Sequence, residues 1–336
     1  MSKKGAANNL YDGIQVAVLG ASGFIGRWVA RTLCARGARL HLVVRDKASA
    51  RAIFTPFKVE GDVVEADLRD PESVSSFFDC IRPAVTFNLV GYGVDRLEND
   101  ESTAFKVNAQ LVTNVCAAIA RIRHREWRGR DIIHVGSALE YGAIGGNLDE
   151  NSVARPTTFY GKSKLVGTCV LEESCKTLGI KGLTARLFTV YGPGEHSGRL
   201  LPTLIAAAHS GAPIPLTVGN QKRDFTYVED VVEGLLRLGG VRTAGPGEIV
   251  NLATGRLLSV RDFAETGARI MKIPPDHLKF GAISTRVEEM EHSAVTIERL
   301  HRLTGWTPPT GVGEGIEKTL AFSASSVTER RVDDGV

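Results

Sequence analysis

Several features that would assign a chain to a particular class of protein are missing from these 336 residues. No run of 18 apolar residues is present, so we expect no membrane-spanning helix. The small, polar start lacks the apolar segment of a secretory leader. Neither sign of charge dominates, because 41 Lys and Arg are balanced by 38 Asp and Glu. The basic residues are also scattered, so we expect no nucleic-acid partner.

Cysteine is scarce, and its positions exclude the common cysteine-based sites. The five cysteines form no CxxC pair and have no metal-binding spacing with histidine; they are Cys34, Cys80, Cys116, Cys169 and Cys175. An odd, scattered set is typical of reduced thiols. The sequence therefore predicts a cytoplasmic protein without a metal site.

The chain does contain a regular alternation of short apolar strands and longer helices. The expected strands are 14–19, 39–44, 57–65, 84–89, 131–135 and 181–187, and the expected helices are 24–36, 71–81, 104–125 and 160–178. Strands that alternate with helices in this way form a parallel sheet with right-handed crossovers. We therefore expect an α/β fold with a doubly wound parallel sheet.

Beyond residue 190 the alternation gives way to Pro and Gly breaks and short helices. We expect 1–190 to form the main domain, with 223–260 partly returning to it, most clearly at Glu248–Leu252. Segments 191–222 and 261–325 then form a smaller, mixed lobe. The polar tail, 326–336, is expected to be disordered.

A glycine-rich turn lies between the first expected strand and the first expected helix. Gly20, Gly23 and Gly26 have the spacing that permits a tight turn, close approach of backbone to a pyrophosphate, and close packing of helix on strand. The N–H groups of the helix N-terminus then face the phosphates. The sequence predicts a dinucleotide-binding turn, completed by Ser22, Phe24, Ile25 and Arg27.

The end of the second strand indicates which nicotinamide dinucleotide is bound. NAD-binding proteins place an acidic residue there to accept hydrogen bonds from ribose, whereas this chain has Val44 followed by Arg45. A guanidinium suits a 2′-phosphate, and Arg27 is a second possible donor. We therefore predict NADP(H), with NAD(H) as the alternative. Asp46 leaves a question open, since it is either a displaced ribose acceptor or a helix N-cap.

Tyr160 and Lys164 form the candidate catalytic pair. Their spacing of four places both on one helix face, where we expect the lysine charge to lower the pKa of the tyrosine. The phenol can then give a proton to a carbonyl or take one from an alcohol. Ser137 follows the strand 131–135, whose C-terminal end lines the expected crevice. We therefore expect Ser137 to orient the reacting oxygen.

Taken together, the motifs resemble the nucleotide-sugar epimerase/dehydratase/reductase branch of the extended short-chain dehydrogenase/reductase family. The resemblance covers about residues 14 to 320 and is closest to reductases of nucleotide-linked 4-keto-6-deoxyhexoses. The motifs include GASGFIG (20–26), NLVGYG (88–93), GSALEYG (136–142), YGKSK (160–164), RLFTVYGPGE (186–195), RLLP (199–202) and RDFTYVEDV (223–231). The resemblance implies a Rossmann domain that binds the dinucleotide, a C-terminal substrate-binding lobe, and a homodimer.

The resemblance also implies roles for residues outside the two core motifs. Cofactor contacts are expected at the adenine, the nicotinamide ribose and the carboxamide, from Asp67, Leu68, Leu89, Val90, Gly91, Asn108, Lys164, Phe188 and Val190. A nucleotide-diphosphate sugar would be the substrate. Its expected contacts are Ala138, Glu140, Arg199, Leu200, Pro202, Arg223 and Arg286, of which the last two would hold the diphosphate.

The residues after Ser137 distinguish between reactions. Nucleotide-sugar 4,6-dehydratases carry an Asp-Glu pair there, whereas this chain has Ala138 and Leu139, which exchange no protons. Three interpretations remain. The first is NADPH-dependent reduction of a 4-keto group, with hydride added at C4 and a proton from Tyr160. The second is a 4-epimerase with tightly held NAD. The third is a non-catalytic dinucleotide sensor, against which the intact Ser137, Tyr160 and Lys164 argue.

Overall fold

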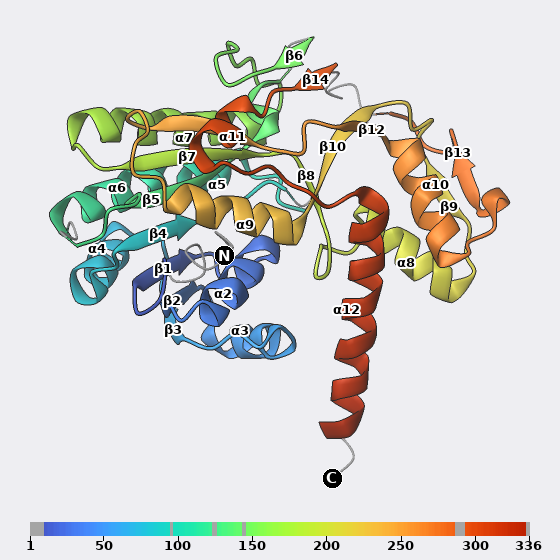
Figure 1. Cartoon of the computed structure of the whole chain (residues 1–336), viewed down its shortest axis with the longest axis horizontal. Helices are drawn as coiled ribbons and strands as arrows, with labels where there is room; N and C mark the ends of the chain where they lie inside the picture. The colour runs from blue at the N-terminus through green and yellow to red at the C-terminus, as the bar shows by residue number, and fades with distance from the viewer. Residues whose placement is uncertain (1–9, 95–96, 123–125, 143–145, 286–292, 334–336) are drawn as a thin grey trace, which may run out of the picture.

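The computed structural model has a seven-stranded sheet at its centre (Figure 1). It describes residues 10–94, 97–122, 126–142, 146–285 and 293–333. All neighbouring strands pair in parallel. Their spatial order is β3 (Asp62–Glu65), β2 (Arg39–Val44), β1 (Gln15–Leu19), β4 (Val85–Asn88), β5 (Ile132–Ser137), β7 (Gly182–Leu187) and β11 (Glu248–Leu252). The predicted doubly wound α/β fold is confirmed.

Helices cover both faces of this sheet, and β1 shows why. Val16 and Val18 pack into one apolar cluster, whereas Ala17 and Leu19 pack into another on the opposite face. A strand buried on both sides reads as a continuous apolar run, as this one does. The first face is covered by α2 (Phe24–Ala35), α3 (Lys47–Phe54) and α9 (Val228–Gly239). The second is covered by α4 (Pro71–Ile81), α6 (Leu111–Ile122) and α7 (Phe159–Thr177).

Two expected elements differ from the structure. The strand expected over 57–65 begins only at Asp62, because Thr55–Phe57 is a 3₁₀ turn and Lys58 has a left-handed φ of 51°. The helix expected over 104–125 is interrupted. It consists of α5 (Glu101–Phe105), a π-helical turn at Lys106–Gln110 and then α6, while 123–125 lie outside the described residues. Such π turns commonly mark functional positions.

The remaining elements form a mixed lobe beside the sheet (Figure 1). β10 (Lys222–Tyr227) pairs in parallel with β8 (Thr189–Tyr191) and antiparallel with β12 (Leu257–Ser259). The other members are two parallel strand pairs and three long helices. They are β9 (Ile214–Leu216) with β13 (Leu278–Phe280), β6 (Asn147–Leu148) with β14 (Ala294–Val295), α8 (Leu200–Ser210), α10 (Val260–Met271) and α12 (Val312–Asp333); the short α11 (Glu298–Thr304) lies against β11.

The C-terminal helix differs from the expected disordered tail. α12 continues to Asp333 and extends away from the lobe (Figure 1), so the backbone of 326–333 is helical. Phe322 anchors this helix, because its ring lies 5.1 Å from those of both Trp28 and Phe57. No Gly or Pro follows before residue 333 to end the helix. The lobe is thereby attached to α2, the helix that follows the glycine-rich turn.

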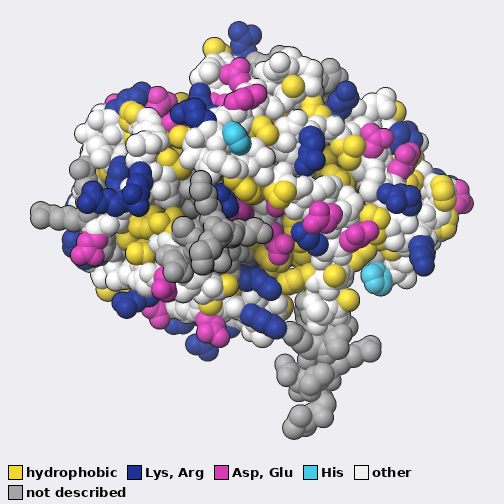
Figure 2. All heavy atoms as spheres, viewed as in Figure 1, with side chains coloured by type: hydrophobic (Ala, Val, Ile, Leu, Met, Phe, Trp, Pro, Cys, Tyr) yellow, Lys and Arg dark blue, Asp and Glu magenta, His cyan; other side chains and the backbone are white. Residues whose placement is uncertain are grey.

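The surface carries charges of both signs. Figure 2 shows Lys and Arg interspersed with Asp and Glu over the face in view. Within the described ranges, no helix combines the length and apolar character needed to cross a membrane. The same part of the chain holds no cluster of three His, Cys, Asp or Glu side chains arranged to bind a metal ion.

Candidate active site

From the strand order we expect the ligand crevice between the loops that follow β1 and β4. From β1 the chain first adds β2 and β3 on one side and then crosses to β4 on the other. Loops at such a reversal leave in opposite directions, and ligands bind between them. Here the two loops begin in contact, because the Leu89 N–H donates to the Leu19 carbonyl over 3.1 Å.

The glycine turn requires its first and third glycines. Gly20 has φ +76° and lies against the loop after β4, where an added Cβ would be 3.2 Å from the Val90 nitrogen. At Gly26 an added Cβ would lie 2.1 Å from the Gly20 carbonyl oxygen. Gly23 is the exposed N-cap of α2 and supplies no side chain to satisfy the N–H groups of the first turn. Such N–H groups bind a pyrophosphate well, so these residues fit a dinucleotide.

The structure answers the question left open at Asp46. Its carboxylate caps α3 by accepting from the N–H groups of Ala48 and Ser49 over 2.9 and 3.2 Å. Hydrogen bonds from Ser49 hold the pKa of Asp46 below its usual value. Asp46 is therefore a helix cap, and Arg45 stays exposed beside it. Arg27 instead stacks over the Phe57 ring at 5.0 Å, which makes Arg45 the better candidate for a 2′-phosphate.

The residues expected at the adenine lie after β3. Asp67 accepts from Arg69 through both carboxylate oxygens, with the shortest distance 2.7 Å. This pair holds the pKa of Asp67 below its usual value and leaves the carboxylate about half exposed. Leu68 is buried in the second apolar cluster. The backbone at this position is therefore well fixed.

Ser137 and Tyr160 are brought together as predicted. Ser137 ends β5, and Tyr160 lies in the first turn of α7, which Thr158 caps by accepting from the Gly161 N–H over 3.0 Å. A hydrogen bond from Ser137 favours the ionised form of Tyr160, but burial has the larger effect and raises the pKa of the phenol. Tyr160 therefore remains protonated, in the form that donates a proton.

The expectation that the Lys164 charge lowers the pKa of Tyr160 is wrong. Its ammonium donates to the carbonyls of Val135 and Val90 over 2.9 and 3.2 Å. Burial lowers the pKa of Lys164 to about 8. The pKa of Tyr160 is raised, and the charge of Lys164 is not among the principal influences on that pKa. A spacing of four residues shows which helix face carries a side chain, but not where its long stem leads.

Asn108 fixes the loop after β4 by hydrogen bonds to its backbone. It lies in the π-helical turn and is fully buried. Its Oδ1 accepts from the Tyr92 N–H over 3.0 Å, and its Nδ2 donates to the Tyr92 carbonyl over 2.8 Å and to Ser163 over 2.9 Å. Asn108 thus joins the loop that contains Leu89, Val90 and Gly91 to α7.

Glu140 does not face the crevice as expected for a substrate contact. Its side chain is fully buried. One carboxylate oxygen accepts from the Ser137 N–H over 2.7 Å, and the other accepts from Thr168 over 3.0 Å and Arg186 over 2.8 Å. The protein itself satisfies this carboxylate, so we withdraw Glu140 as a substrate contact. Ala138, between Ser137 and Glu140 in the chain, is 9% exposed.

The other expected substrate residues lie mostly at the lobe. Arg199 is the exposed N-cap of α8 and is close enough to Tyr160 for its charge to favour the phenolate. Leu200 and Pro202 follow in the first turn of α8, and Arg223 lies in β10. Phe188 and Val190 lie where β7 passes into β8. Arg286 is outside the described residues.

Sequence reasoning did not identify His134 and Glu195 as buried ionisable groups. His134 in β5 is fully buried, its Nδ1 is 3.1 Å from the Asn88 amide, and burial holds its pKa well below the usual value. Glu195 has a side chain that is only 7% exposed, with Oε1 3.6 Å from Arg199 Nε. Burial raises the pKa of Glu195 to about 7. The YGPGE string named this position, but nothing in it indicated burial.

We expect Glu195 to make the folded protein less stable as the pH rises. The folded chain binds this proton more tightly than the unfolded chain, so its contribution to stability is present below about pH 4.5 and is lost by about pH 7. In urea unfolding, the free energy of unfolding of Glu195→Gln should exceed that of the wild type at pH 8 by on the order of 2 kcal/mol and match it closely at about pH 4.

The matched control is Glu265→Gln. Glu265 also pairs with an arginine four residues away over 3.6 Å, but both side chains are substantially exposed. This variant should show no such pH-dependent gain. An equal gain in the free energy of unfolding for Glu195→Gln at both pH values would contradict a raised pKa of Glu195.

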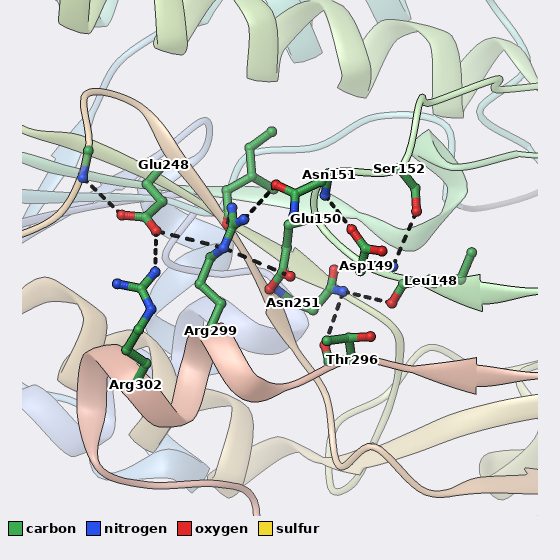
Figure 3. A network of polar contacts seen from close by, with 12 residues as sticks. Leu148, Asp149, Glu150, Asn151, Ser152, Glu248, Asn251, Thr296, Arg299 and Arg302 are labelled. Carbon is green, nitrogen blue, oxygen red and sulfur yellow. Dashed lines mark hydrogen bonds and ion pairs between the residues drawn. The ribbon is translucent and has the colours of Figure 1, made fainter.

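A second polar network anchors the loop between Ser137 and Tyr160 (Figure 3). Asn251 of β11 donates to the Leu148 and Thr296 carbonyls over 3.3 and 3.2 Å, and its N–H donates to Glu150 over 2.9 Å. Arg299 of α11 donates to the Asn151 side chain over 2.8 Å. The buried Tyr141 hydroxyl donates to Asn251 over 2.7 Å. The loop is therefore held by segments more than 100 residues away.

Comparison with known proteins gives consistent relatives. A model of the NAD dependent epimerase/dehydratase family matches residues 16–253. The chain is 28% identical over 314 residues to the dTDP-6-deoxy-L-talose 4-dehydrogenase (NAD(P)(+)) of Kitasatospora kifunensis, covering 90% of this chain and 94% of that protein. MoeE5 in complex with UDP-glucuronic acid and NAD has a TM-score of 0.79 at 25% identity, covering 93% of this chain and 99% of that one.

A longer plant protein matches only in part. The trifunctional UDP-glucose 4,6-dehydratase/UDP-4-keto-6-deoxy-D-glucose 3,5-epimerase/UDP-4-keto-L-rhamnose-reductase of Arabidopsis thaliana is 26% identical over 332 residues. The alignment covers 92% of this chain but 47% of that protein, so the chain spans about half of its length.

Proposed function

Because the chain belongs to the NAD dependent epimerase/dehydratase family of extended short-chain dehydrogenases/reductases, we propose that it reduces the 4-keto group of a nucleotide-linked 4-keto-6-deoxyhexose with NADPH. The observation that carries the proposal is the hydrogen bond that places the Tyr160 phenol beside Ser137, at the end of β5. A phenol and a hydroxyl side by side can together bind a carbonyl oxygen and protonate it as the hydride is added.

Each residue has a distinct part in the proposed reaction. A bound nicotinamide dinucleotide supplies or accepts the hydride at its reactive ring. Tyr160 donates its proton to the substrate oxygen, and the Ser137 hydroxyl hydrogen-bonds the same oxygen and orients it. Lys164, fixed by two backbone carbonyls, places its ammonium beside the loop after β4, where it binds the cofactor ribose. Ala138 and Leu139 exchange no protons, which argues against 4,6-dehydration.

We assign dinucleotide binding to the domain built on the seven-stranded sheet and substrate binding mainly to the lobe. The glycine turn and α2 hold the dinucleotide pyrophosphate, with Asp67 and Leu68 at the adenine. Arg223 and Arg286 hold the substrate diphosphate, and Arg199 is a further substrate contact. The name of the Kitasatospora relative, a 4-dehydrogenase of a dTDP-6-deoxyhexose, supports a 6-deoxy sugar and reaction at C4. A cytoplasmic homodimer remains part of the proposal.

The alternative is a nucleotide-sugar 4-epimerase with NAD. It is favoured by MoeE5, whose structure contains NAD and UDP-glucuronic acid. Reductase and epimerase differ in stoichiometry, so the test is to incubate the protein with a nucleotide-linked 4-keto-6-deoxyhexose and follow NADPH absorbance. The proposal expects one NADPH consumed per sugar converted. Conversion of a nucleotide hexose without net NADPH consumption would support the epimerase instead.

Arg45 is expected to select NADPH. Arg45→Ala should weaken NADPH binding about 10- to 100-fold, because one charge-assisted contact to the 2′-phosphate is lost, and should leave NADH binding unchanged. Fluorescence titration with both cofactors measures the effect. Arg51→Ala, an exposed arginine on the adjacent helix α3, is the control and should change neither affinity. Equal losses for NADPH and NADH would contradict the assignment.

A further inference from the structure

Glu140 connects the elements that carry the proposed catalytic residues. Its Oε1 accepts from the backbone N–H of Ser137 at the end of β5. Its Oε2 accepts from Thr168, which lies on α7 one turn beyond Lys164, and from Arg186 on β7. All three partners are themselves at least nine-tenths buried. One carboxylate therefore ties together β5, α7 and β7 directly behind the crevice.

Space around this carboxylate is tight. An added Cβ at Gly136 would lie 2.5 Å from Glu140 Oε1, so the strand before Ser137 approaches the side chain closely. The Arg186 guanidinium is held from its other side by the Tyr141 ring at 4.4 Å. A carboxylate enclosed in this way cannot shift without moving Ser137.

The same carboxylate is a source of negative charge near the catalytic pair. Glu140 raises the pKa of Lys164 against the larger lowering by burial, and it also raises the pKa of Tyr160. Other charged and titratable groups of the described residues lie near the pair or beside Glu140. They are His134 on β5, Arg186 on β7, Arg199 on α8, and Glu98 in the loop after β4.

We propose that Glu140 is a positioning residue that fixes the Ser137 backbone and supplies the buried negative charge that stabilises the Lys164 ammonium. The inference rests on the assignment of Ser137, Tyr160 and Lys164 as the reacting set. In this proposal Glu140 does not contact the sugar, as the resemblance implied, but acts through Ser137 and Lys164. Without that charge a buried ammonium loses its proton at lower pH.

The effect of the Glu140 charge on Lys164 is tested without measuring catalysis. In protein labelled with ¹³C-lysine, the Lys164 signal is assigned by its absence in Lys164→Arg and titrated by NMR. The wild-type midpoint is expected near 8. Glu140→Gln should lower it by about one pH unit. Thr168→Val removes a hydrogen bond but keeps the charge, so its midpoint should match the wild type. An unchanged midpoint in Glu140→Gln overturns the charge role, even if no sugar is ever reduced.

The positioning role is tested by kinetics with the sugar substrate. Glu140→Asp keeps the charge but shortens the side chain away from Ser137, so it should lower kcat about 10-fold or more, retain the Lys164 midpoint, and leave KM for NADPH within about threefold. Glu140→Gln should lose more activity at pH 8 than at pH 6, because Lys164 regains its proton at low pH.

Folding is monitored throughout by thermal melting, since Glu140→Gln leaves the Arg186 charge buried without its partner. If that variant fails to fold, Glu140→Asp still decides the positioning role, and wild-type kcat in it overturns the proposal. If the wild type reduces no sugar at all, the proposed function has failed, whereas the lysine titration still reports on Glu140.

Discussion

Tyr160→Phe is expected to lower kcat by about 1,000-fold or more while leaving NADPH affinity nearly unchanged. General acid catalysis by a positioned side chain contributes roughly 10² to 10⁴ in rate. Phenylalanine keeps the ring that packs against Gly93, where an added Cβ would lie 3.2 Å from Tyr160 Cδ2. Only the hydroxyl is removed.

The measurement pairs steady-state reduction with cofactor titration. Tyr92→Phe is the control, because its hydroxyl accepts from the exposed Asp100 N–H over 3.4 Å on the neighbouring loop. That variant should retain most of the activity. Wild-type turnover by Tyr160→Phe would mean that another group donates the proton, and a parallel loss of NADPH binding would mean that Tyr160 acts chiefly in binding.

Gly26→Ala is expected to weaken dinucleotide binding by about 100-fold or more, which corresponds to about 2.7 kcal/mol. The new Cβ would lie 2.1 Å from the Gly20 carbonyl oxygen and 2.9 Å from that of Ala21. Both are backbone atoms of the pyrophosphate turn, so neither can move aside without reshaping the turn. The loss in binding free energy for the dinucleotide should therefore exceed any loss in the free energy of unfolding.

Affinity for NADPH and NADH is measured by fluorescence, and unfolding by urea. Gly313→Ala is the matched control, because an added Cβ there meets only the Ile270 side chain at 4.0 Å. It should leave cofactor affinity unchanged and should not lower the free energy of unfolding, since alanine favours a helix over glycine. Wild-type cofactor affinity in Gly26→Ala would show that the turn relaxes without cost, or that the dinucleotide binds elsewhere.

The local sequence determined the parts of the site that depend on local geometry. Gly20, Gly23 and Gly26 could be placed between β1 and α2 because their spacing and the apolar run before them define a strand, a turn and a helix within 20 residues. Ser137 could be placed at the end of a strand for the same reason. The alternation of elements was enough to predict the doubly wound sheet, since few other arrangements bury such strands on both faces.

Only the tertiary structure decided where the longer polar side chains lead. Asp46 caps α3, which decided between its two expected roles, and Lys164 donates to carbonyls of β5 and of the loop after β4. Glu140 pairs with Arg186, which is 46 residues away in the chain. Spacing along a helix or strand specifies the face that a residue occupies, but its partner is set by which distant strand lies alongside. Whether a carboxylate meets substrate or core is therefore a property of the packed sheet.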